Sequence, residues 1–70
     1  MKKLNPNKLL LSKWTSAVPK NKEKHFIVTE LIRDEDETVT EVVLEAVYNK
    51  NTYPMPWQTL QQAQWLQGWK

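Results

Sequence analysis

"HFIVTELIRDEDETVTEVVLEAVY", residues 25–48, carries the clearest secondary-structure pattern of the chain. It contains two runs rich in β-branched and aromatic residues, 25–33 and 38–48, separated by a short acidic segment. Such runs are typical of β-strands, and a polar segment of this length between them is typical of a turn. The sequence therefore predicts an antiparallel hairpin in which the two runs are neighbouring strands.

Alternation predicts which side chains of this hairpin share a face, because successive residues of a strand point to opposite sides. One face carries the apolar residues at even positions, Phe26, Val28, Ile32, Val42, Leu44, Ala46 and Tyr48. A register that pairs Phe26 with Leu44 keeps them together and leaves a three-residue loop, residues 34–36. The opposite face also holds aliphatic residues, so we expect the N-terminal segment or the curvature of the sheet to cover part of it.

The segments that flank the hairpin predict further strands. Pro54 and Pro56 are two residues apart, so their missing N–H donors lie on one side of a strand, and residues 52–57 are expected to form an edge strand. Residues 9–18, "LLLSKWTSAV", are interpreted as a strand that Pro19 ends, followed by a loop over residues 19–24. Residues 1–8 are expected to be flexible.

The C-terminal tail predicts an α-helix over residues 57–67, with Gly68 as its C-cap. The apolar face of this helix consists of Trp57, Leu60, Ala63 and Leu66. Trp65 points the other way, beside Gln58 and Gln61. Three outcomes are open for Trp65: a break of the helix in the glutamine run turns it inward, the N-terminal segment covers it, or it stays exposed as an interface anchor.

These elements predict one domain over residues 1–70, of the α+β class. It has an antiparallel sheet of three to four strands, which could curl towards a small barrel, and one C-terminal helix. Trp14, Trp57 and Trp69 are expected to be mostly buried, because so small a chain needs most of its four tryptophans for its core.

The residue inventory argues against catalysis. The chain has no cysteine, one histidine and one glycine, so the common zinc-ligand sets and glycine-rich phosphate loops are absent. The one histidine, His25, is expected to pair with Glu45 across the outer face of the hairpin. We therefore expect no enzyme activity, catalytic residue, metal or cofactor. No segment approaches the roughly 20 apolar residues of a membrane span, and we expect a soluble cytoplasmic protein, monomeric or weakly dimeric.

The distribution of charge supports two binding hypotheses. Residues 1–24 contain seven lysines and one glutamate, whereas residues 25–45 contain one arginine and seven acids. The first hypothesis is a noncatalytic interaction module that binds a protein or peptide through Trp65, Gln58 and Gln61. The alternative is nucleic-acid binding by the lysine-rich N-terminal third, with Trp14 stacking a base. The lysines concerned include Lys13, Lys20, Lys22 and Lys24.

Four segments, "NPNKLLLSKWTSAVP", "NKEKHFIV", "LEAVY" and "WLQGW", resemble a family of small, conserved, tryptophan-rich bacterial proteins. The family is an uncharacterized one, defined by a domain of unknown function. The resemblance covers Asn5 to Trp69 and is strongest in "LLLSKWT", "KEKHF" and the closing Trp-x-x-Gly-Trp. It implies a relationship but no activity, ligand or catalytic residue.

Overall fold

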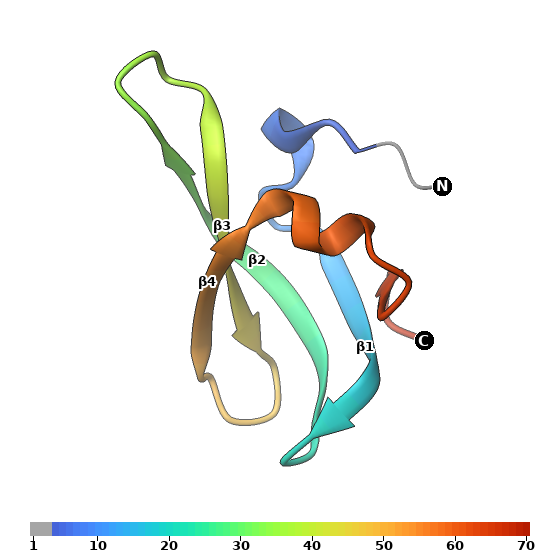
Figure 1. The fold of residues 1–70 in the computed structure, drawn as a ribbon. Coiled ribbons are helices and arrows are strands. Elements are labelled where there is room, and N and C mark those ends of the chain that lie inside the picture. Colours follow the sequence, from blue (N-terminus) through green and yellow to red (C-terminus); the bar gives the residue numbers. More distant parts are fainter. Residues whose placement is uncertain (1–3) are drawn as a thin grey trace.

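The structure, a computed structural model, describes residues 4–70 (Figure 1). This part of the chain is a five-stranded antiparallel sheet with two 3₁₀-helices and no α-helix. The elements are η1 (Pro6–Lys8), β1 (Lys13–Lys20), β2 (Glu23–Arg33), β3 (Val39–Ala46), β4 (Thr52–Pro56), η2 (Trp57–Gln61) and β5 (Trp65–Gln67). The strand order is β4-β3-β2-β1-β5. The protein is therefore all-β, and the expected α+β class with a C-terminal helix is wrong.

The central hairpin confirms the predicted neighbours and faces but not the predicted register. β2 and β3 pair, and Phe26 and Leu44 are both buried in the core. Phe26 pairs with Ala46 instead of Leu44, and the loop is residues 35–37. The Asp34 side chain explains the difference: its Oδ1 accepts from the backbone N–H groups of Asp36, at 2.9 Å, and Thr38, at 3.0 Å. Asp34 thereby closes the turn one residue later than predicted.

An irregularity in β2 changes which residue reaches the core. The register shifts between Val28 and Glu30, so Thr29 is an extra residue in the ladder. Beyond it Leu31 pairs with Val42 and packs against the core, whereas Ile32, which was expected there, pairs with Glu41. A bulge of this kind also bends its strand and increases the local twist.

β4 is an edge strand, as its prolines predicted. The Ala46 N–H donates to the Asn51 carbonyl at 2.8 Å, so the odd-numbered residues of β4 turn their backbone groups towards β3. The missing donors of Pro54 and Pro56 consequently face away from the sheet. This side of the sheet cannot offer a regular ladder to another strand.

The C-terminal tail forms a short 3₁₀-helix and a strand in place of the expected helix. η2 ends at Gln61, and Gln62 is extended (φ −77°, ψ 155°). β5 then pairs with β1, with Trp65 opposite Ser16, and Trp65 is 8 % exposed. The break in the glutamine run, one of the three outcomes considered for Trp65, is the one observed. A short isolated helix is marginal in water, whereas the observed path buries an indole and adds a strand to the sheet.

β1 and β2 are joined by a two-residue turn, so the expected loop over residues 19–24 is wrong. Asn21 and Lys22 have φ of 55° and 66°, the positive values that a type I′ turn requires. The pairing of β1 with β2 shifts between Thr15 and Lys20, leaving residues 16–19 opposite the single residue 24. β1 therefore arches away from β2 there, while its first part remains paired with β5.

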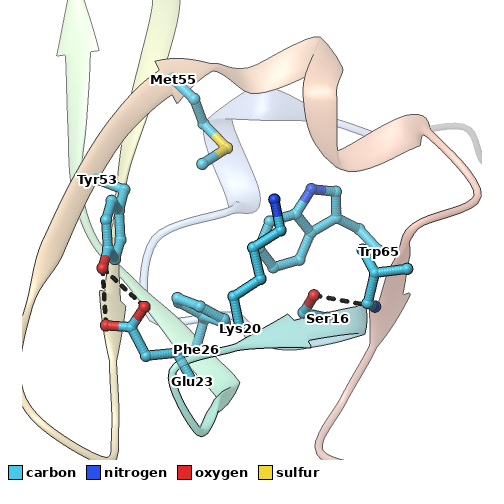
Figure 2. Close-up of a pocket in the computed structure, with 8 residues that line it drawn as sticks. Ser16, Lys20, Glu23, Phe26, Tyr53, Met55 and Trp65 are labelled. Carbon is cyan, nitrogen blue, oxygen red and sulfur yellow. Dashed lines mark hydrogen bonds between the residues drawn. The ribbon is translucent and has the colours of Figure 1, made fainter.

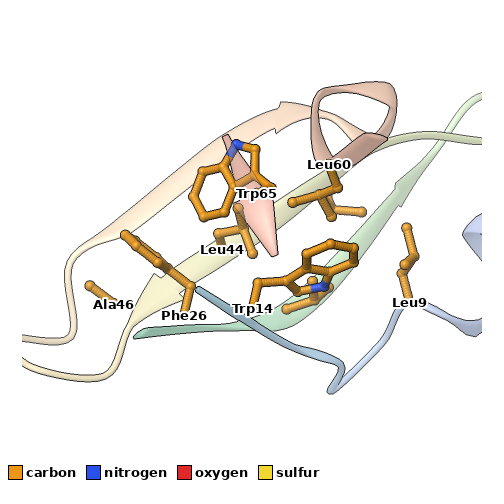
Figure 3. Close-up of a cluster of buried hydrophobic side chains, with 9 residues drawn as sticks. Leu9, Trp14, Phe26, Leu44, Ala46, Leu60 and Trp65 are labelled. Carbon is orange, nitrogen blue, oxygen red and sulfur yellow. The ribbon is translucent and has the colours of Figure 1, made fainter. Parts of the chain in front are cut away.

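The core fills the concave side of the bent sheet (Figure 3). Its buried members are Leu9, Trp14, Phe26, Val28, Val42, Leu44, Ala46, Leu60 and Trp65. Trp14 is buried as expected, Trp57 is partly buried against the core, and Trp69 is 45 % exposed, contrary to expectation.

The N-terminal segment lies against this core. Leu4 packs on the core, η1 follows, and Leu9 is 4 % exposed. Residues 1–3 of the segment expected to be flexible lie outside the described residues, and the flexibility of residues 4–8 stays a prediction. In the part of the chain that the structure describes, no helix has the length and apolar content that crossing a membrane requires.

Candidate functional site

A hollow of about 220 Å³ lies where β1 arches away from β2, on the concave side of the sheet. Residues of β1, β2, β4 and β5 line it, so the bend of the sheet brings its two edges around one space (Figure 2). The lining residues are Ser16, Val18, Lys20, Glu23, Phe26, Tyr53, Met55 and Trp65. We call this space the concave hollow.

Three aromatic rings give the concave hollow a fixed shape. The Phe26 ring contacts Trp65 edge-on, with centroids 5.2 Å apart and an interplanar angle of 78°. It contacts Tyr53 in a similar way, at 6.2 Å and 67°. Edge-to-face contacts of this geometry are favourable beyond the area that they bury. The aromatic walls therefore hold one another in place.

Glu23 forms a polar link at the Tyr53 side of the concave hollow. It is 6 % exposed, and the Tyr53 hydroxyl lies 2.7 Å from each of its carboxylate oxygens. The Asn51 amide donates to the same carboxylate at 3.2 Å. The hydrogen bond from Tyr53, then that from Asn49, holds the pKa of Glu23 below its ordinary value despite burial. Glu23 is therefore an ionised group that ties β2 to β4.

The same hydrogen bond acts on the phenol. Because the Tyr53 hydroxyl donates to a carboxylate, losing its proton would place two negative charges side by side. The hydrogen bond to Glu23 accordingly raises the pKa of Tyr53. Tyr53 is a neutral hydrogen-bond donor throughout the physiological range.

Two further donor groups belong to residues on the Trp65 side of the concave hollow. The indole Nε1 of Trp65 is buried and has no hydrogen-bond partner among the described residues. Lys20 is exposed, and its stem runs across the mouth of the hollow towards the Trp65 ring (Figure 2). The two sides of the hollow therefore differ. The Tyr53 side carries the ionised Glu23, which is hydrogen-bonded to its neighbours, whereas the Trp65 side carries the donor groups of Trp65 and Lys20.

The structure separates most residues that the sequence nominated for binding. It brings Lys20 and Trp65 together in the concave hollow. Lys22 and Lys24 are exposed at the β1–β2 turn, whereas Trp14 is fully buried and cannot stack on a base. Gln58 and Gln61 lie on η2 and Lys13 lies on the outer face of the sheet, all three outside the hollow.

Sequence reasoning missed most of the residues that line the concave hollow. Phe26 was assigned to the core, Tyr53 and Met55 to the edge strand, and Val18 to the N-terminal strand. Each assignment is correct as local structure. Only the bend of the sheet brings these residues together, and no spacing in the sequence signals it.

The outer face carries a second aromatic arrangement, which we call the C-terminal clasp (residues 68–70 with Lys13, Thr15 and His25). Thr15 Oγ1 donates to the Gly68 carbonyl at 2.7 Å and accepts from the Lys70 N–H at 2.9 Å. The Trp69 indole N–H donates to the Phe26 carbonyl at 3.0 Å, and Lys13 Nζ lies 4.7 Å from the Trp69 ring centroid. The outer face is thus partly covered, as expected, but by the C-terminal tail.

His25 belongs to this clasp and does not pair with Glu45. Its ring centroid lies 5.9 Å from that of Trp69, and its Nε2 lies 3.1 Å from the Lys70 carbonyl oxygen. Glu45 instead lies 3.8 Å from Lys50 Nζ. The histidine was misplaced because the register of the hairpin puts it beside Val47. Among residues 4–70, no three His, Asp or Glu side chains converge as metal ligands would.

Comparison with known proteins gives one relationship. No curated protein and no solved structure matches this chain. The model of a tryptophan-rich protein family, defined by a domain of unknown function (DUF2389), matches residues 12–70. This match covers all five strands, begins just before β1 and includes all four tryptophans. The chain therefore belongs to the tryptophan-rich protein family DUF2389.

Proposed function

We propose that this domain is a noncatalytic binding module that holds a segment of a protein or peptide partner in the concave hollow. The observation that carries the proposal is the hollow itself. It is an aromatic recess of about 220 Å³, with exposed Val18 and Lys20 at its border. Recesses walled by rigid aromatic rings are where partner side chains anchor most strongly.

The volume of the concave hollow favours a single side chain as its occupant. Small-molecule sites usually enclose about 300–1,000 Å³. An engineered apolar cavity of about 150 Å³ binds benzene. A hollow of about 220 Å³ therefore fits one large apolar side chain better than a cofactor or a substrate with its reacting groups. The remainder of the partner segment would lie along the rim.

The polar groups near the concave hollow are engaged in ways that favour binding over catalysis. Glu23 accepts from Tyr53 and Asn51, and Ser16 Oγ accepts from the Val18 N–H at 3.2 Å. The one histidine of the chain lies in the C-terminal clasp, on the opposite face. Among the described residues we find no nucleophile paired with a base in the hollow. A binding role is the simpler account.

Nucleic-acid binding is the competing hypothesis. The residue that was expected to stack on a base, Trp14, is not accessible. Trp14 is fully buried, and Lys13 is packed over the Trp69 ring. Lys20 lines the hollow, and Lys22 and Lys24 are exposed on the same hairpin. We interpret them as a positively charged flank for an acidic partner segment.

The test is selection from a random displayed peptide library on the immobilised domain. We expect peptides with a shared large apolar residue, whose binding perturbs amide resonances of Val18, Phe26 and Tyr53. Val18→Asp places a charge at the border of the hollow and should weaken these peptides at least about tenfold, because a buried unpaired charge is unfavourable. Val47→Asp, at an exposed valine outside the hollow, is the matched control and should bind normally.

Two results would contradict the proposal. One is the absence of any enriched sequence, or resonance changes that lie outside the concave hollow. The other is that single-stranded DNA at about 50 mM salt binds while peptides do not, which would favour the nucleic-acid hypothesis.

A further inference from the structure

The unpaired indole N–H of Trp65 is the starting observation. Trp65 is more than nine-tenths buried, and its Nε1 has no acceptor among the described residues. A buried donor without a partner is unfavourable, and such groups are rare in folded proteins. Trp65 also lines the concave hollow. A ligand that brings an acceptor to this wall would remove the deficit.

Lys20 is a second donor at the same wall. It lines the concave hollow together with Trp65, and no ion pair or side-chain hydrogen bond of Lys20 is found within residues 4–70. Neither an ammonium nor an indole N–H has an acceptor lone pair, so the two groups cannot satisfy each other. Both groups would be satisfied by a hydrogen-bond acceptor from a ligand.

The charges around the concave hollow indicate which acceptor this is and where it lies. Lys20, Lys22 and Lys24 lie on one hairpin with a single acid, Glu23, which is the register partner of Lys20 but is hydrogen-bonded to Tyr53 and Asn51. The net charge of this border is therefore positive. The opposite wall carries the Glu23 carboxylate, already bound by Tyr53 and Asn51. An anionic group would be repelled from the Glu23 wall and attracted to the Trp65 wall.

We infer that the ligand of the concave hollow presents a carboxylate beside a large apolar side chain. The carboxylate accepts from the Trp65 indole N–H and pairs with Lys20, while the apolar side chain packs against Phe26. This inference rests on the proposed function of the hollow. The Trp65 N–H is covered in the free protein, so a ligand reaches it only when a covering side chain moves. The exposed Lys20 side chain, whose stem lies over the Trp65 ring in Figure 2, is the group that this inference requires to move. The carboxylate is either a chain terminus or an acidic side chain next to the apolar residue.

The test uses three labelled peptides that share one phenylalanine. In the first, phenylalanine is followed by aspartate and the C-terminus is amidated; in the second, asparagine replaces the aspartate. The third ends at phenylalanine with a free carboxylate. We expect the better of the two carboxylate peptides to bind at least about tenfold tighter than the asparagine peptide, since hydrogen bonds to charged groups are the stronger ones. The first and third peptides distinguish the two sources of the carboxylate.

A spectroscopic readout and a pair of variants locate the contact. Among the four indole N–H resonances, that of Trp65 should move downfield on binding, as a new hydrogen bond requires. Lys20→Met should remove most of the preference for the carboxylate peptide over the asparagine peptide. Lys8→Met, the control at an exposed lysine of η1 outside the hollow, should change both affinities by less than about threefold.

The possible failures are distinguishable. Equal binding of the aspartate, free-carboxylate and asparagine peptides, or equal effects of the two lysine variants, overturns the carboxylate inference alone. If no peptide of this set or of the displayed library binds the parent, the proposed function fails and the inference fails with it.

Discussion

Trp65 and Trp69 are four residues apart and occupy opposite faces of the same sheet. They also differ in whether the indole N–H has a hydrogen-bond acceptor. Trp65 is 8 % exposed, lies in the core and has an indole N–H without a partner among the described residues. Trp69 is 45 % exposed, yet its indole N–H is bonded to the Phe26 carbonyl and its ring is covered by Lys13. Burial and hydrogen-bond satisfaction are thus separate properties in this domain.

The difference suggests two kinds of site. The C-terminal clasp pairs the polar groups of the tail internally, as a structural feature does. The concave hollow instead combines an aromatic recess with an indole N–H and an ammonium group that have no partner among the described residues, the arrangement that the proposed binding function would use.

Removing Trp65 should be the most damaging change. Trp65→Ala deletes a core ring that packs on Phe26, and truncations of this kind reduce the free energy of unfolding by about 3–5 kcal/mol. Trp69→Ala should reduce it by only roughly 1–2 kcal/mol, the sum of one hydrogen bond and one cation–π contact. Urea unfolding followed by circular dichroism measures both. Equal losses would show that the clasp is as much a part of the core as the hollow.

The stability of the C-terminal clasp should depend on the hydroxyl group of Thr15. Thr15 is 1 % exposed, and its Oγ1 bridges the Gly68 carbonyl and the Lys70 N–H. Thr15→Val keeps the shape but leaves both groups unpaired, and the free energy of unfolding should fall by about 1–2 kcal/mol. Thr52→Val, at an exposed threonine, is the control and should stay within about 0.5 kcal/mol of the parent. Faster hydrogen exchange at Gly68 in Thr15→Val would place the effect in the clasp.

The Glu23–Tyr53 link should shape the pH dependence of stability. The pKa of Glu23 is lowered from 4.5, so its contribution is present above that pH and is lost as pH falls through the folded-state value. The pKa of Tyr53 is raised from 10.0, so its contribution is present below pH 10 and is lost as pH rises further. Stability should decline at both extremes, and Tyr53→Phe should flatten both declines.

Tyr48→Phe is the matched control for the link, because Tyr48 is 65 % exposed and belongs to neither site. Urea unfolding from pH 3 to 11 should leave its profile parallel to that of the parent. A Tyr53→Phe profile that also runs parallel to the parent would mean that the link does not act in solution.

The hairpin illustrates how far sequence patterns reach. Alternation correctly placed Phe26 and Leu44 on one face and identified the edge strand from its two prolines. It missed the exact register, because that depends on the Asp34 side chain closing the turn and on two extra residues in the ladder, Thr29 in β2 and Thr40 in β3. These are single-residue choices of hydrogen bonding that the periodicity of a strand does not encode.

The C-terminal tail and the concave hollow could not be predicted from the sequence, because both depend on contacts between distant segments of the chain. Local periodicity favoured a helix over residues 57–67, but β1, some fifty residues earlier, offers Trp65 a strand partner and a place in the core. The hollow likewise depends on contacts between distant segments, such as Tyr53 with Glu23, 30 residues apart. The sequence pointed to Lys20 because of its charge and to Trp65 because it lay off the apolar face of the expected helix. The two residues line the same hollow only because of the topology of the sheet.

The smallest expected effect is the difference in stability between variants of two lysines, Lys13 beside Trp69 and Lys20 beside Trp65. Lys13 lies over the Trp69 ring, so Lys13→Met should lower the free energy of unfolding by about 0.5–1 kcal/mol through the lost cation–π contact. Lys20 has no ion pair or hydrogen-bonded side-chain partner among residues 4–70, so Lys20→Met should change stability by less than about 0.5 kcal/mol. Both substitutions remove one charge and keep an unbranched stem, so the general effect of net charge cancels in the comparison. Chemical denaturation at two salt concentrations should give the same difference, because a cation–π contact at close range is screened less than the long-range field. A Lys20→Met variant that is clearly less stable than Lys13→Met would mean that Lys20 has a structural partner, and the donors of the concave hollow would no longer be in reserve for a ligand.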